Sequence, residues 1–86
     1  MYFKGNDKVW LIVNTADYVC GLMLDTALYE LYTEEVTDGA YADGRIKSID
    51  DFKKVIGRFS VDHADDFQID DVYDIAMGVI DMVESF

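Results

Sequence analysis

Three carboxylates and the one histidine of the chain gather in the segment Asp62-His63-Ala64-Asp65-Asp66, where a divalent cation could find its ligands. The segment lacks the D-x-[DN]-x-[DN]-G spacing and the closing glutamate of an EF-hand loop. Acids at this position also gain a few tenths of a kcal/mol, roughly, from the dipole of a helix that follows them. We therefore interpret the segment as an acidic loop before a helix, and we predict no metal ion and no cofactor.

Nucleophilic catalysis needs a base beside a hydroxyl or thiol, and only His63 could serve. No spacing links it to Cys20 or to a serine. The six glycines form neither GxGxxG nor GxxxxGK[ST], so a nucleotide-phosphate loop is not expected. Pairs of carboxylates arise by chance in a chain with so many acids. Cys20 is expected to be a small buried side chain, because no Lys or Arg occurs between Val9 and Gly44 to activate its thiol. We predict no catalytic residue and no enzyme.

The charge of the chain is more informative than these groups. Eighteen acids and seven bases in 86 residues give a net charge of −11 and a pI near 4.1. Such a chain is not expected to bind DNA, RNA or an anionic membrane directly, and a partner held by charge should be basic. Five of these seven Lys and Arg residues lie close together, and the last 28 residues contain eight acids and no Lys or Arg. The five clustered bases are Arg45, Lys47, Lys53, Lys54 and Arg58.

The predicted last helix places Asp70, Asp74, Asp81 and Glu84 on the side away from its apolar stripe. At 1.5 Å per residue, these acids are separated by rises of about 6, 10.5 and 4.5 Å, which is compatible with a row of phosphates. A second acidic patch is expected elsewhere on the molecule. The candidate partner-binding residues are Asp62, Asp65, Asp66, Asp70, Asp71, Asp74, Asp81 and Glu84, with Glu30, Glu34, Glu35 and Asp38 in the second patch.

In size and composition the chain resembles the small acidic proteins that phages encode against host defences, including anti-CRISPR proteins and other DNA mimics. The resemblance implies a non-enzymatic inhibitor that occludes a basic nucleic-acid-binding site on a protein or ribonucleoprotein complex. The alternative is an immunity or antitoxin protein, or a regulatory subunit, that binds a basic protein partner. We expect a cytoplasmic protein, including the cytoplasm of an infected host cell, because no signal peptide or membrane-spanning run is visible.

The N-terminal half is predicted to form strands. Residues 2–4 and the apolar run Val9–Val13 suggest a short strand, a turn and a central strand. Residues 18–24 are ambiguous, because Thr15 could instead cap a single helix over residues 16–35. Gly21 would cost that helix roughly 1 kcal/mol, so we favour a strand here and a helix that begins near Asp25 or Thr26.

The C-terminal half is predicted to be helical. Residues 37–44 contain two Asp-Gly pairs, which are typical of a loop or hairpin. Ser48 should cap a helix that ends near Phe59, with Asp50 and Asp51 in its first turn. Apolar residues at helical spacing from Ile69 to Val83 predict the last helix.

Together these elements predict one α+β domain over residues 1–86, in which a small antiparallel sheet of N-terminal strands packs against two or three helices. The C-terminal helix should be the longest. With one cysteine, the fold has no internal disulfide. The expected core residues are Trp10, Ile12, Phe52, Val55, Ile56, Phe59, Ile69, Val72, Tyr73, Ala76, Val79, Ile80 and Val83.

Overall fold

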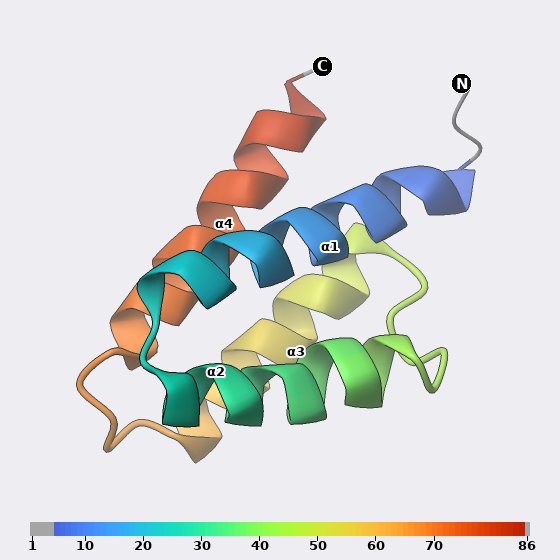
Figure 1. Ribbon diagram of the computed structural model, residues 1–86. Helices are drawn as coiled ribbons and strands as arrows, with labels where there is room; N and C mark the ends of the chain where they lie inside the picture. The colour runs from blue at the N-terminus through green and yellow to red at the C-terminus, as the bar shows by residue number, and fades with distance from the viewer. Residues whose placement is uncertain (1–4, 86) are drawn as a thin grey trace.

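The computed structural model describes residues 5–85, in which every regular element is a helix and no strand is present (Figure 1). The predicted α+β fold with an antiparallel sheet is therefore wrong. The predicted strand at residues 2–4 lies outside the described residues. The elements are α1 (Gly5–Met23), α2 (Thr26–Tyr32), the π-helix η1 (Thr33–Tyr41), α3 (Ile49–Asp62) and α4 (Ile69–Glu84).

Helix α1 replaces two of the three strands that we expected in the N-terminal half, those at residues 9–13 and 18–24. Its buried side chains recur at helical spacing and face the rest of the molecule. A short apolar run such as Val9–Val13 fits a buried strand or a buried helix equally well. The strand prediction, which was based on the length of this run, is therefore wrong. Residues 18–24 are helical up to Met23. The buried residues of α1 are Val9, Ile12, Val13, Ala16 and Cys20.

Gly21 lets α2 approach α1 closely. A Cβ atom built on Gly21 would lie only 3.2 Å from Cζ of Tyr29, so a larger residue would displace that ring. Helix α2 begins where the sequence indicates, because the Asp25 side chain accepts a hydrogen bond from the Leu28 amide at 2.8 Å. The Asp25 amide donates to Oε1 of Gln68 at 3.0 Å, which ties this junction to the loop before α4.

Helix η1 occupies most of the segment that we predicted as a loop. The buried side chains of α2 and η1 recur every four residues, at Leu28, Tyr32, Val36 and Ala40. In an α-helix, steps of four rotate the side chain by about 40° each, so this set would drift off the core. A π-helix closes its hydrogen bonds at i→i+5 and is wider, which offsets that drift. Of the two Asp-Gly pairs only the second forms a turn, with Gly44 at φ 79°.

Helices α3 and α4 agree with the prediction in type and position. The Ser48 hydroxyl accepts a hydrogen bond from the Asp51 amide at 3.1 Å and caps α3. Helix α3 continues to Asp62, past the expected end near Phe59. The prediction that the C-terminal helix is the longest is wrong, since α1 has 19 residues and α4 has 16.

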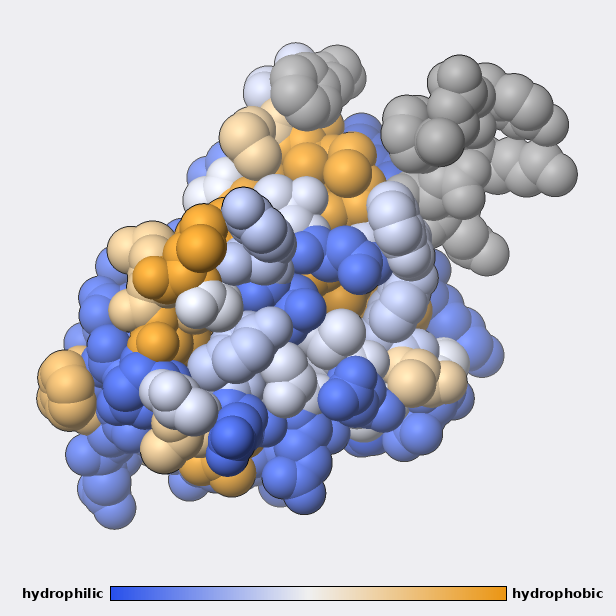
Figure 2. Space-filling view, in the orientation of Figure 1, coloured by the Kyte–Doolittle hydropathy of each residue, from blue (hydrophilic) through white to orange (hydrophobic). Residues whose placement is uncertain are grey.

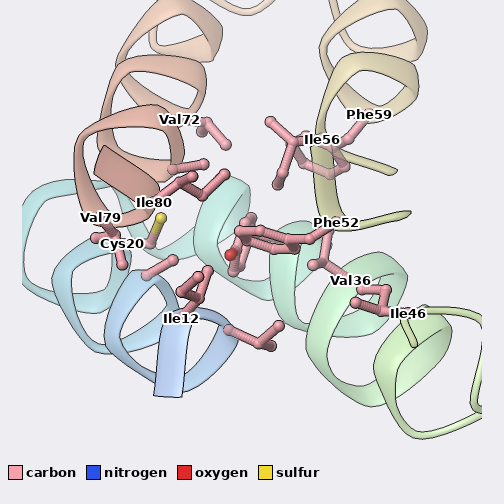
Figure 3. Packing of buried hydrophobic residues seen from close by; sticks show 14 of the residues in the cluster. Ile12, Cys20, Val36, Ile46, Phe52, Ile56, Phe59, Val72, Val79 and Ile80 are labelled. Carbon is pink, nitrogen blue, oxygen red and sulfur yellow. The ribbon is translucent and has the colours of Figure 1, made fainter. Parts of the chain in front are cut away.

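The core lies where all the helices meet, with α4 packed against both α1 and α3. Figure 3 shows Ile12 and Cys20 of α1 near Val79 and Ile80 of α4, while Phe52 reaches the centre from α3. The Tyr32 and Phe59 rings pack edge to face with their centroids 5.9 Å apart. None of the helices in residues 5–85 is long and apolar enough to cross a bilayer.

Two expected core residues lie largely at the surface. Trp10 is 49% exposed and Tyr73 is 44% exposed, while Val55 is partly buried. Trp10 was assigned to the core because a strand covered on both faces would bury it, whereas on α1 its position faces outward. Residues that the sequence analysis did not select take their place, and the largest is Tyr32, which is fully buried.

Candidate functional site

The acids of α4 lie on its solvent side. Because the apolar stripe of this helix packs against α1 and α3, the opposite side faces outward. Five acids are exposed there: Asp70, Asp71, Asp74, Asp81 and Glu84. The helix is continuous from Ile69 to Glu84, so the rises between these acids expected from the sequence apply to the structure.

The acidic loop that precedes α4 has both a structural and an exposed part. Oδ1 of Asp66 accepts a hydrogen bond from the Gln68 amide at 2.8 Å, which shapes the turn into α4. Asp62 pairs with Arg58 one helical turn earlier, at 3.3 Å. Asp65 is exposed. Within residues 5–85, no three His, Cys, Asp or Glu side chains are placed together to hold a metal ion.

The second acidic patch lies on α2 and η1. Glu30, Glu34 and Asp38 are exposed and follow one another at steps of four residues. The buried side chains of these two helices have the same spacing. Glu35 is half-buried and turns toward α3.

His63 joins the two patches, which we had expected to lie apart. Its Nε2 contacts Oε2 of Glu35 across 28 positions of sequence, and its ring packs on Phe59 with the centroids 4.6 Å apart. A hollow of about 390 Å³ lies beside this contact, lined by Leu28, Leu31 and the loop from Asp62 to Asp66. The acids of η1 therefore lie next to those of the loop. Sequence spacing gave no signal for this link, because it depends on how η1 packs against α3.

Most of the candidate acids have no positive partner. In the part of the chain that the structure describes, Asp62 forms an ion pair with Arg58, and Glu35 contacts His63. The other ten are Glu30, Glu34, Asp38, Asp65, Asp66, Asp70, Asp71, Asp74, Asp81 and Glu84, and we call them the acidic surface.

The exposed apolar side chains of α1 form a second feature of the surface. Tyr18, Leu22 and Met23 are 68%, 69% and 60% exposed, and Trp10 lies two helical turns before Tyr18. Trp10, Tyr18 and Leu22 lie on the side of α1 away from its buried residues, and we call these three residues the outer face of α1. In Figure 2, hydrophobic residues gather at the upper left of the view, where α4 and the end of α1 lie, and hydrophilic residues cover much of the lower part. The molecule thus presents both charged and apolar surfaces to a partner.

Cys20 is buried among the apolar side chains between α1 and α4. Burial raises the pKa of its thiol to about 12, and the negative charge of Asp17 adds to this effect. A thiol with so high a pKa is a poor nucleophile at neutral pH.

No protein-family model matches this chain, and no curated protein or solved structure matches it either.

Proposed function

We propose that this protein is a non-enzymatic inhibitor that occludes a basic nucleic-acid-binding site on a protein or ribonucleoprotein complex, in the manner of phage anti-CRISPR proteins and other DNA mimics. The observation that carries the proposal is the acidic surface, whose ten carboxylates have no ion-pair partner among the described residues. No catalytic step, metal or cofactor takes part. The expected partner presents a groove rich in lysine and arginine.

Unpaired acids at this density have an energetic cost. Like charges repel each other in the compact state, and a small domain has little stability in reserve. Solubility alone would be served by acids interspersed with lysines, which is the common arrangement on protein surfaces. The region from Phe59 to Phe86 has eight acids and no base. A binding role explains why these charges are kept together.

The shape of α4 suits such a role. Its 16 residues extend over about 24 Å, and acids are present from the first turn to the last. Duplex DNA carries about one negative charge per 1.7 Å of axis, so a basic groove built for DNA can accept a rigid row of carboxylates. Electrostatic attraction speeds the encounter, and side chains such as Tyr73 and Met82, which are partly exposed on α4, supply contact area.

The alternative is an immunity or antitoxin protein, or a regulatory subunit, that binds a basic protein without covering a nucleic-acid site. The outer face of α1 favours this alternative. Exposed aromatic and aliphatic side chains in one region are typical of protein interfaces, and these lie on a different helix from the acids of α4. The two proposals differ in whether nucleic acid competes with this protein for its partner.

The first experiment is an affinity capture from host lysate at low and at high salt, followed by competition with DNA or RNA. For an inhibitor of a nucleic-acid-binding site, the captured complex should be released by high salt and displaced by nucleic acid. A partner that stays bound in excess nucleic acid would support the immunity or subunit function and overturn occlusion.

Charge-reversed variants then locate the binding surface on that partner. Replacing Asp70, Asp74, Asp81 and Glu84 together with lysine should weaken binding by about a hundredfold or more, because attraction becomes repulsion. Glu30, Glu34 and Asp38 changed to lysine test the second patch in the same way. The isosteric Asn and Gln variants separate charge from shape, and helical circular dichroism confirms folding. If both lysine variants bind as the wild type does, the acidic surface is not the site.

A further inference from the structure

A groove lies between η1 and α3. Its volume is about 280 Å³, and its walls come from three segments. Val55 supplies an apolar floor above the buried Val36 and Phe59, while charged side chains surround it. The full lining is Glu35, Val36, Arg45, Lys54, Val55, Arg58, Phe59 and Asp62.

Three of the seven bases in this acidic chain line the groove. Arg45 comes from the connection after η1, while Lys54 and Arg58 come from successive turns of α3. Arg45 pairs with Asp43 at 3.2 Å and Arg58 with Asp62 at 3.3 Å, both at exposed sites where such pairs exchange readily with a ligand. Lys54 forms no ion pair with any of the described residues. The lining therefore holds three bases against two acids, in a protein of net charge −11, and Lys54 is the base without an ion pair among the described residues.

The π-helix shapes the wall opposite α3. A Cβ atom on Gly39 would lie 2.5 Å from the Glu34 carbonyl oxygen, so only glycine fits this turn as it stands. The same atom would lie 3.7 Å from Nη2 of Arg45, so the guanidinium lies beside Gly39 of η1. Widened turns of this kind occur frequently at functional sites.

We propose that this groove binds a small phosphate monoester. The phosphate lies among Arg45, Lys54 and Arg58, whose guanidinium and ammonium groups are the usual donors to phosphate oxygens. The apolar floor takes the organic part, and Glu35 accepts hydrogen bonds from its hydroxyl groups. Lys54 and Asp62 are eight residues apart on α3, or about 12 Å, which matches a ligand of mononucleotide size.

Two observations favour a small anion over a nucleic acid. The groove volume is near the lower end for small-molecule sites, which run from about 300 Å³ upward. The strong negative charge of the rest of the molecule would also repel a long polyanion. This proposal does not depend on the inhibitor function, because it concerns different residues.

The test is a titration of the whole protein with inorganic phosphate, adenosine monophosphate and adenosine at constant ionic strength, followed by amide NMR shifts. Phosphate and the monophosphate should shift the amides of residues 35–45 and 54–62, and adenosine alone should not. Tighter binding of the monophosphate would identify an organic phosphate as the ligand, and equal binding would identify inorganic phosphate.

Lys53 provides a matched control, because it is exposed on α3 beside Lys54 and does not line the groove. Lys54→Gln should weaken phosphate binding about tenfold, while Lys53→Gln should leave it within about twofold of the wild type. Equal losses in both variants would show a nonspecific charge effect and overturn the proposal. So would the absence of groove shifts with millimolar phosphate, or equal shifts with adenosine.

Discussion

The buried thiol of Cys20 should make the free energy of unfolding fall at alkaline pH. Burial raises its pKa from 9.0 to about 12, so the native state keeps the proton over a range in which the unfolded chain loses it. The contribution of this group to the free energy of unfolding is complete below about pH 9 and decreases as pH rises toward 12. Urea unfolding at several pH values above 8 should therefore show a steeper loss of stability for the wild type than for Cys20→Ala. Parallel losses in the two proteins would contradict this assignment.

Glycines in two helices have opposite expected responses to alanine. At Gly39 in η1 the new Cβ would meet the Glu34 carbonyl oxygen at 2.5 Å, so the π-helix must rearrange. We expect Gly39→Ala to lower the free energy of unfolding by roughly 1–3 kcal/mol, as strain does at a position that requires glycine.

At Gly57 in α3 a Cβ would meet nothing within 4 Å, so Gly57→Ala serves as the control and should stabilise the protein by roughly 0.5–1 kcal/mol. Thermal unfolding of both variants measures these effects. A stabilising alanine at Gly39 would show that η1 does not need its widened turn.

The sequence predicted some of the helices and not others. Helices α3 and α4 were found because Ser48 is a strong cap and because the apolar spacing of α4 continues over four turns. Helix α1 was missed because Val9–Val13 is apolar without a break and because Gly21 suggested an interruption. Gly21 is instead explained by the ring of Tyr29, and this contact between helices is invisible to local propensity.

The same limit applies to the candidate site. The exposure of Asp70, Asp74 and Asp81 follows from one amphipathic helix, so spacing alone predicted it. The contact between Glu35 and His63 depends on the packing of η1 against α3, and η1 resembled a loop because of its Asp-Gly pairs. The cluster of bases was visible in the sequence, but only the fold places Arg45 beside Lys54 and Arg58 around one groove.

At the scale of the whole molecule, the net charge of −11 should make stability depend on salt. The ten acids of the acidic surface repel one another, and added NaCl shortens the range of that repulsion from about 30 Å at 0.01 M to about 8 Å at 0.15 M. The melting temperature should therefore rise with NaCl. A variant with Asn at Asp70, Asp74 and Asp81 should melt higher at low salt and respond less to salt. A melting temperature that falls with NaCl would contradict a fold under net repulsion.

Trp10, the only tryptophan of the chain, also provides an intrinsic fluorescent probe of binding. Because Trp10 is 49% exposed on the outer face of α1, its fluorescence should be red-shifted and readily quenched by acrylamide. A partner that covers this face should shift the emission to the blue and protect the ring from quencher. A partner that docks only on the solvent side of α4 should leave both properties unchanged. One emission spectrum recorded with the partner can thus tell, without a label, which surface is occupied.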